Sequence, residues 1–213
     1  MAVWTDDCAD ADNTKLASRV TDGSDAWAVV SGFSEASHFL EVLNNTLVSG
    51  SNGGRTWYYV SLDPGSNDYY IQASFKVPSS GNVGPSITVR QKVSAETCYL
   101  LRWSSGWNLR RLVSGSVTVL ASGDTTNSPV SAEVTGYLEV VDNGVNADYT
   151  VKAGGSTIYS GTDTSPITER GRAGAGNYYG DAFSSRYIDN LECGTVVGGG
   201  STHHLHLPLL GVG

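Results

Sequence analysis

Acidic side chains gather near the start of the chain and return close to its end. Asp6 and Asp7 belong to the first group, and Asp189 to the second. Carboxylate oxygens are hard ligands of the kind that calcium takes in proteins. If both ends of the chain meet in the fold, Asp6, Asp7 and Asp189 form a candidate site for a structural calcium ion. The alternative is a solvated acidic surface, because the segment after Asp10 lacks the glycine and the distal glutamate of an EF-hand.

Aromatic residues offer a second kind of chemistry, because flat rings that face outward can stack on sugar rings. Adjacent residues of a strand point to opposite faces, so each pair of neighbouring aromatic residues should present one ring to solvent. Trp107, Tyr178 and Tyr179 lie in glycine-rich sequence that is typical of loops. They are the candidate carbohydrate-binding residues, and packing in the core or at its rim is the alternative.

Paired carboxylates of the kind that hydrolyse glycosidic bonds are not evident. Such enzymes place two acids on either side of the bond that breaks. The closest pairs are Glu139 with Asp142 and Asp189 with Glu192, each three residues apart. This spacing puts the two side chains on opposite faces of a regular strand. The sequence also lacks a G-x-S-x-G elbow and a phosphate loop. We therefore expect no enzymatic activity, and a glycan hydrolase is the weaker alternative.

The three cysteines are far apart in the sequence. Cys8, Cys98 and Cys193 fit no zinc pattern, which needs ligands a few residues from each other. Two interpretations stay open. All three are small buried thiols, or Cys8 and Cys193 form a disulfide between the first and last strands and leave Cys98 over.

The elements that would position these residues are strands. Charged residues make up 16% of the 213-residue chain, and 26 residues are glycine, a composition poor in helix formers. Residues 69–77 alternate apolar and polar side chains, which is the pattern of a strand with one buried face. Similar segments recur at short intervals, separated by turn pairs such as Ser114-Gly115, Asn143-Gly144 and Gly154-Gly155. The expected strand segments are 27–30, 69–77, 86–91, 97–104, 108–113, 117–121, 134–141, 148–153, 157–160 and 187–193.

This pattern predicts an all-β fold, an antiparallel two-sheet jelly-roll sandwich with an extended C-terminal tail. We expect one jelly-roll domain over residues 1–194 and a glycine-rich tether with an apolar peptide over residues 195–213. A solvated tail has no reason to carry many leucines. The peptide therefore buries itself against this chain or anchors it to a neighbouring protein. The anchoring candidates are Leu205, Leu207, Leu209, Leu210 and Val212.

Several segments, taken in order, resemble the concanavalin-A-like lectin/glucanase superfamily, which includes laminin-G-like domains. The opening Trp4-Thr5-Asp6-Asp7-Cys8 is similar to the start of such domains. The other segments that carry the resemblance are 27–32, 98–103, 108–112, 119–123, 171–174 and 188–191. The resemblance covers most of residues 1–194 and implies a jelly roll, with a structural calcium at the terminal strands in lectin-like members.

Matches with a glycine-rich tether and a short His/Leu terminus look most like virion proteins of tailed bacteriophages. The resemblance implies a non-catalytic structural protein, either a capsid decoration or a fibre component. It also implies a virion location, with assembly in the host cytoplasm and function outside the cell. The expected partners are other virion proteins and further copies of the chain, most plausibly in a homotrimer. A tail adhesin that binds a bacterial surface glycan is the alternative.

Charge and hydropathy argue against nucleic acid and membranes as partners. The formal net charge of −8 disfavours nucleic acid, because phosphate binding needs clustered Lys and Arg. No run of about 18 apolar residues is present, so we expect no membrane span. Residues 1–7 lack the basic and apolar pattern of a secretory leader. We expect synthesis without signal-directed export, which Met1 favours, and a leader removed before residue 1 is the alternative.

Overall fold

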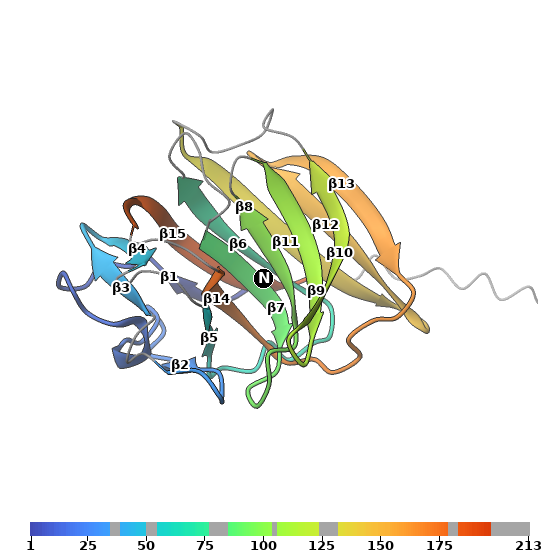
Figure 1. Cartoon of the computed structure of the whole chain (residues 1–213), viewed down its shortest axis with the longest axis horizontal. Coiled ribbons are helices and arrows are strands. Elements are labelled where there is room, and N and C mark those ends of the chain that lie inside the picture. The colour runs from blue at the N-terminus through green and yellow to red at the C-terminus, as the bar shows by residue number, and fades with distance from the viewer. Residues whose placement is uncertain are drawn as a thin grey trace, which may run out of the picture.

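The computed structural model describes residues 1–34, 39–49, 55–76, 85–103, 106–123, 132–178 and 183–196. Within this part of the chain the fold is two antiparallel β-sheets and a single 3-10 turn, Leu16–Ser18. The sheets stack face to face, as Figure 1 shows. This is the two-sheet sandwich that the sequence predicts. None of the helices in the described residues is long and apolar enough to cross a membrane.

One sheet contains eight strands and carries both ends of the described chain. Its order is β13-β12-β11-β6-β15-β4-β3, and β1 pairs with β15 outside this path. The strands are β1 (Ala2–Asp6), β3 (Leu40–Leu43), β4 (Thr46–Ser49), β6 (Tyr69–Lys76), β11 (Val134–Asn143), β12 (Asn146–Ala153), β13 (Ser156–Asp163) and β15 (Phe183–Thr195).

The other sheet contains seven strands in the order β10-β9-β8-β7-β14-β5-β2. Its strands are β2 (Trp27–Val29), β5 (Arg55–Val60), β7 (Pro85–Gln91), β8 (Cys98–Trp103), β9 (Trp107–Val113), β10 (Ser116–Gly123) and β14 (Arg172–Tyr178). Five of these fifteen strands were not among the segments expected from alternation: β1, β3, β4, β5 and β14.

The main core fills the space between the sheets. In β12 every second residue is buried, from Ala147 to Ala153, which is the period of a strand with one face against a core. The opposite sheet contributes residues such as Tyr99, Leu101 and Trp103. A second, smaller cluster of buried apolar residues lies on the outer face of the seven-stranded sheet. It consists of Val30, Trp57, Cys98, Leu100 and Leu112.

The two ends of the described chain pair with each other, as expected. Strand β1 runs antiparallel to β15, with Trp4 opposite Cys193 and Asp6 opposite Leu191. Of the two interpretations of the cysteines, the buried free thiols are confirmed and the Cys8–Cys193 disulfide is wrong, because all three thiols are free and buried. Cys8 lies two residues beyond the end of β1 and adopts a φ of 57°, whereas Cys193 pairs with Trp4 inside the ladder.

Turns join most neighbouring strands of the sheets. Ser114-Gly115 and Gly154-Gly155 form two-residue turns as predicted, whereas the turn between β11 and β12 is Gly144-Val145, one residue later than predicted. Asn143 instead pairs with Asn146 at the end of the ladder. The tether and apolar peptide lie beyond residue 196, outside the described residues, so the proposed domain boundary stays a prediction.

Candidate binding face beside the terminal strands

A row of polar and aromatic side chains crosses the outer face of the eight-stranded sheet. It runs over five strands, because Thr5 lies opposite Glu192, Glu192 opposite Gln72, Gln72 opposite Tyr137, and Tyr137 opposite Lys152. Their strand neighbours Trp4, Cys193, Ile71, Leu138 and Val151 are buried. Alternation therefore turns this set outward. We call Thr5, Glu192, Gln72, Tyr137 and Lys152 the outer row.

Two tyrosine rings stand beside each other in this face. The rings of Tyr70 and Tyr137 stack with centroids 5.0 Å apart and planes 24° apart, and the Lys152 ammonium lies 4.3 Å from the centroid of the Tyr137 ring. The Tyr70 hydroxyl donates to Glu192 and the Tyr137 hydroxyl donates to Glu139. Burial, and then these carboxylates, raise the pKa of both tyrosines. Both hydroxyls therefore stay protonated and act as donors.

Glu192 connects the outer row to a neighbouring cleft. Its second carboxylate oxygen accepts a hydrogen bond from the Gln72 amide at 3.1 Å. The cleft, which we call the terminal cleft, has a volume of about 250 Å³. It is lined by Thr5, Asp6, Asp7, Asp22, Asn190, Leu191 and Glu192. Glu192 and Thr5 thus belong to both features.

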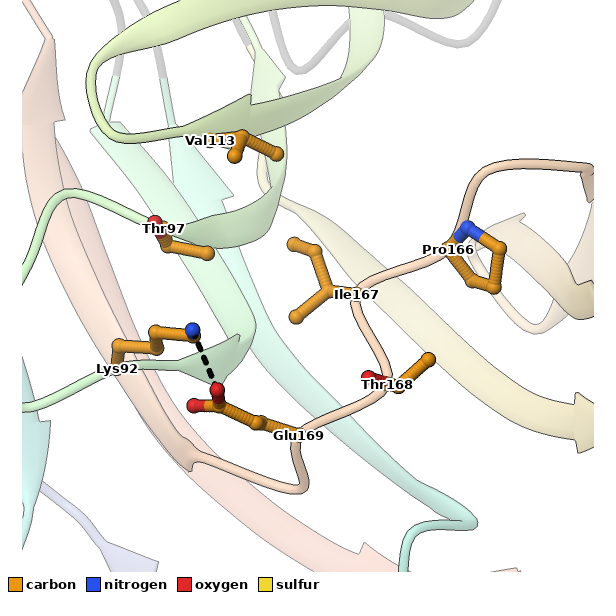
Figure 2. Close-up of a pocket in the computed structure, with 7 residues that line it drawn as sticks. All are labelled: Lys92, Thr97, Val113, Pro166, Ile167, Thr168 and Glu169. Carbon is orange, nitrogen blue, oxygen red and sulfur yellow. Dashed lines mark hydrogen bonds and ion pairs between the residues drawn. The ribbon is translucent and has the colours of Figure 1, made fainter.

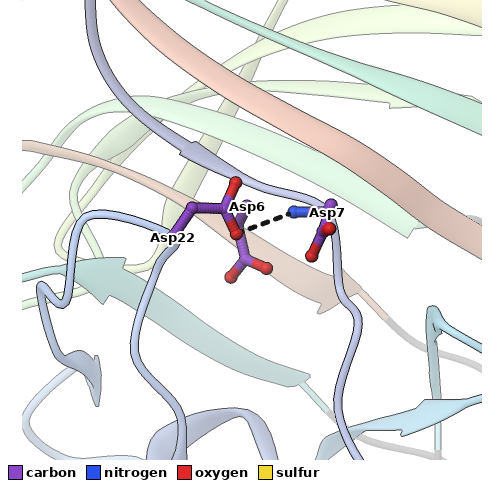
Figure 3. Close-up of side chains that lie close together, drawn as sticks. All are labelled: Asp6, Asp7 and Asp22. Atoms are coloured by element: carbon purple, nitrogen blue, oxygen red, sulfur yellow. Dashed lines mark hydrogen bonds between the residues drawn. The ribbon is translucent and has the colours of Figure 1, made fainter.

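Three carboxylates come together in the terminal cleft. Oxygens of Asp6, Asp7 and Asp22 lie within 4.8 Å of one another, as Figure 3 shows. The Thr5 hydroxyl donates to Asp22 at 2.9 Å, and the Asp7 amide donates to Asp22 at 3.4 Å. The structure thus joins Asp6 and Asp7 as expected and brings Asp22 beside them. Asp22 belongs to the acids near the start of the chain, and its place depends on the fold of residues 7–21.

Asp6 differs from the other two carboxylates because it is buried and its oxygens already have hydrogen-bond and ion-pair partners. It accepts hydrogen bonds from the Cys8 amide at 2.8 Å and from the Trp27 indole at 2.7 Å, and it forms an ion pair with Arg19 at 2.8 Å. Burial raises the pKa of Asp6 against the lowering effect of these partners. Arg19 thus supplies the positive charge that Asp6 needs.

The exposed acids of this group are therefore better calcium ligands than Asp6. Asp7 and Asp22 are exposed and can turn oxygen lone pairs toward an ion, whereas Asp6 already has a guanidinium partner. Asn190, which lines the same cleft, adds an amide oxygen of the type that calcium accepts. Asp7, Asp22 and Asn190 are the residues that fit a hard cation.

Asp189 lies next to this group on a bulge of β15. The register shifts between Asp189 and Glu192, and Asn190 adopts a φ of 49°. Asp189 pairs with Ser74 and Glu192 pairs with Gln72, so both acids point to the outer face. The prediction that these two side chains lie on opposite faces is wrong, because the bulge adds a residue. Burial, and then Glu133, Asp7 and Asp6, raise the pKa of Asp189.

The other pair of acids follows the prediction. Glu139 turns outward toward Tyr137, whereas Asp142 forms an ion pair at 2.6 Å with Arg90, whose side chain is buried. The two carboxylates therefore lie on opposite faces of β11. Arg90 also donates to the Ile167 carbonyl at 2.6 Å, so Asp142 helps to hold the loops at this end of the sandwich.

The aromatic residues expected to bind sugar do not form a site in the described structure. Trp107 begins β9 and is 5% exposed, and its ring packs against Tyr159 with centroids 5.8 Å apart. The expectation of an outward ring on a loop is wrong for Trp107. Tyr178 ends β14 opposite Arg55, but its side chain is not described. Tyr179 lies outside the described residues.

A second hollow lies at the end of the sandwich where β8 begins. Figure 2 shows that Lys92 and Glu169 meet at one side of it, and their ion pair measures 2.6 Å. Its volume is about 160 Å³, smaller than the 250 Å³ of the terminal cleft. Because its two charged groups bind each other, the terminal cleft and the outer row are the better candidate site.

Comparisons with known proteins identify the fold. No family model matches the chain, and no curated protein matches its sequence. Solved structures do match. They include the carbohydrate-binding module CBM66 from Bacillus subtilis, with a TM-score of 0.59, 15% identity, and coverage of 79% of this chain and 95% of that one.

Two further matches belong to a lectin and a glucanase. The metal-free VIP36 exoplasmic/lumenal domain has a TM-score of 0.55 at 10% identity, with coverage of 88% of this chain and 92% of that one. The Bacillus licheniformis β-glucanase has a TM-score of 0.54 at 9% identity, with coverage of 88% and 99%. The fold of this chain is the concanavalin-A-like jelly roll that the sequence resemblance implied.

Proposed function

We propose that this concanavalin-A-like jelly roll is a non-catalytic glycan-binding module that binds its ligand on the outer row and the terminal cleft. The observation that carries the proposal is the outer row itself. It sets a hydroxyl, a carboxylate, an amide and a tyrosine side by side on a solvent-facing sheet. Sugar hydroxyls both donate and accept hydrogen bonds, so a mixed row of this kind matches them.

The geometry of the row supports binding with little rearrangement. Glu192 is held by Tyr70 and Gln72, and Tyr137 is held between Tyr70 and Lys152. Side chains that are fixed before binding lose less conformational entropy when a ligand arrives. The carbohydrate-binding module and the lectin among the structural matches add the support of analogy.

Substitutions in the outer row test this proposal. We expect Gln72→Ala and Tyr137→Ala each to weaken binding to a polysaccharide ligand by about 5- to 30-fold, because each removes about 1–2 kcal/mol of contact. Thr118→Ala, on exposed β10 of the other sheet, is the matched control and should bind normally. Isothermal titration after a glycan-array screen measures both. An array without any ligand, or unchanged affinity in both variants, would contradict the proposal.

The absence of catalysis is part of the proposal. Asp189 and Glu192 share the outer face, so they are the acids to test for hydrolysis. The Glu192 carboxylate accepts hydrogen bonds from both Tyr70 and Gln72, an arrangement suited to holding a ligand. We expect no release of reducing ends from bound polysaccharide. Release that disappears in Glu192→Gln would make the chain a hydrolase.

We also propose that a structural calcium ion binds Asp7, Asp22 and Asn190 in the terminal cleft. One matching VIP36 structure is described as Ca²⁺-bound, which supports calcium by analogy. At a concentration 100 times its Kd, an ion adds about 2.7 kcal/mol to stability. We therefore expect calcium to raise Tm relative to EDTA, Asp22→Asn to abolish the rise, and Glu169→Gln to keep it. Equal Tm values in calcium and EDTA for the unmodified chain would refute the ion.

As a second candidate, we propose that the module works on the outside of a bacteriophage particle. There it would be a tail adhesin or a capsid or fibre component, with virion proteins and copies of itself as partners. The glycine-rich tether and apolar peptide favour this setting, because they are typical of chains that join larger assemblies. Labelling of purified particles with an antibody tests it, and particles that never carry the chain would contradict it.

A further inference from the structure

The edge strands on the two lateral sides of the sandwich differ in whether other segments hydrogen-bond to them. On one side, the edge strand β3 receives hydrogen bonds from the segment before it, because Asn13 donates to the Val42 carbonyl and Val42 donates to the Thr14 carbonyl. Edge strand β2 is similarly joined to Arg19 through the Trp27 amide. On the other side, β10 and β13 end their sheets, and Figure 1 shows them together, away from β1–β4.

Strand β13 is an edge strand that is open to pairing with a further strand. It is eight residues long, and no backbone group of the described residues pairs with its outer side. Exposed edges are often blunted by Lys or Pro, and β13 contains neither. Its one charge, Asp163, stands at its last position and forms an ion pair with Arg111 at 2.6 Å. The pairing with β12 has one irregularity, a register shift between Thr157 and Tyr159. The Tyr159 ring, 39% exposed, stands at this open side.

The peptide beyond residue 196 has the pattern of a strand. Leu205, Leu207 and Leu209 alternate with His204, His206 and Pro208, which gives one apolar face with a period of two. Residues 205–212 are eight in number, as are those of β13. Proline is tolerated on an edge strand where its missing N–H points away from the sheet.

The peptide also has the reach that β13 requires. The Val196 amide donates to the Asp68 carbonyl, at the end of the sheet where Asp163 finishes β13. Five strand spacings separate β15 from a strand added beyond β13, or about 24 Å. Residues 197–204 span up to about 26 Å when extended. A strand that enters beside Asp163 then runs antiparallel to β13.

We propose that residues 205–212 of this chain add to β13 as an antiparallel ninth strand of the eight-stranded sheet. The row formed by Leu205, Leu207 and Leu209 covers the open side of the sandwich at Tyr159. A short glycine-rich tether gives the peptide a millimolar effective concentration, so attachment to its own β13 outcompetes capture by a neighbouring copy in dilute solution. Strand β10 keeps a free edge.

Proline substitutions in the full chain provide a matched pair of variants. Pro208 points its nitrogen away from β13, and so do the other even-numbered residues, because N–H direction alternates along a strand. Leu207→Pro removes an N–H that bonds to β13 and should release the peptide. His206→Pro removes an N–H that points away and should leave the peptide attached.

Hydrogen exchange at low micromolar protein concentration measures attachment. We expect the β13 amides that do not bond to β12 to exchange at least 100-fold more slowly than the free-edge amides of β10. Leu207→Pro should abolish this protection and His206→Pro should keep it. Exchange as fast as in β10 for the unmodified chain would overturn the proposal. So would protection that is lost as sedimentation shows an oligomer dissociating, because the peptide would then belong to a neighbouring copy.

Discussion

The position of the Trp107 ring depends on Gly123, a glycine in the neighbouring strand. A Cβ atom at Gly123 would stand 2.2 Å from the indole nitrogen of Trp107. Glycine at this position in β10 therefore makes room for the ring to turn into the core beside Tyr159. The same kind of glycine-rich sequence that suggested a loop instead permits close packing between two strands.

Trp107→Ala should therefore affect folding. Removing a buried tryptophan leaves a cavity and typically lowers the free energy of unfolding by about 3–5 kcal/mol. Urea denaturation followed by circular dichroism measures this change. Val119→Ala, at an exposed position of the neighbouring strand β10, is the control and should change stability by less than about 0.5 kcal/mol. A Trp107 variant as stable as this control would show that the ring is not a core residue.

Asp189 predicts a dependence of stability on pH. Its pKa in the folded protein is raised above the ordinary value of 3.8, so the folded protein holds this proton more tightly than the unfolded chain does. The free energy of unfolding then falls as the pH rises from 3.8 through the folded pKa. Asp189→Asn removes this cost, so we expect a higher Tm at neutral pH.

The measurement is a series of Tm values in EDTA from pH 3.8 to neutrality, which keeps calcium out of the comparison. The difference between Asp189→Asn and the unmodified chain should grow with pH and then level off. Thr118→Ala, an exposed position of β10 without an ionisable group, is the control and should give a difference that does not change with pH. A difference that shrinks as the pH rises would contradict the assignment.

Among the elements, β11 depends most visibly on a small residue. A Cβ atom at Gly136 would lie 2.2 Å from the Trp103 ring and 2.7 Å from the Phe75 ring. Trp103 and Phe75 pack against each other with centroids 5.1 Å apart. Strand β11 can therefore pass over this aromatic pair only where it carries no side chain.

Gly136→Ala should destabilise the protein by overpacking this contact. Extra methyl groups in a filled core usually cost about 1–3 kcal/mol. Gly23→Ala is the matched control, because its Cβ would meet its nearest neighbour at an ordinary 3.5 Å. Equilibrium unfolding in urea distinguishes the two variants, and equal stability would mean that the core yields at Trp103.

Period-two alternation made several strands predictable from the sequence. Residues 69–76 and 146–153 each bury one face completely or nearly so. The pairing of the chain ends was also correctly anticipated. Its register was not, because register depends on contacts between residues almost 190 positions apart, and this register separates Cys8 from Cys193.

The candidate site was predictable only in part. Asp6 and Asp7 were expected in it, and they line the terminal cleft. The outer row was not expected, since Gln72, Tyr137 and Glu192 become neighbours only through strand order and register. The bulge at Asn190 reverses which side Glu192 faces, and alternation counted along the sequence cannot reveal such a reversal.

At the scale of the whole molecule, chemistry is distributed unevenly over the sandwich. The eight-stranded sheet carries the outer row and, at its chain-end strands, the acids of the terminal cleft. The outer face of the seven-stranded sheet instead bears the second apolar cluster around Trp57 and Leu100. The proposed ligand-binding residues and the second apolar cluster thus lie on opposite faces, so substitutions on one face should leave the other unaffected.

The pairing of β1 with β15 also determines how the protein would respond to mechanical force. Ala2 lies opposite Gly194, and the Thr195 amide donates to the Met1 carbonyl, so a load applied to residues 1 and 196 pulls two adjacent points apart. The hydrogen bonds of an antiparallel pair lie perpendicular to its strands, so they would break one after another, as in unzipping. Force applied at these two points would open the sandwich at low load, beginning at the strands that border the terminal cleft.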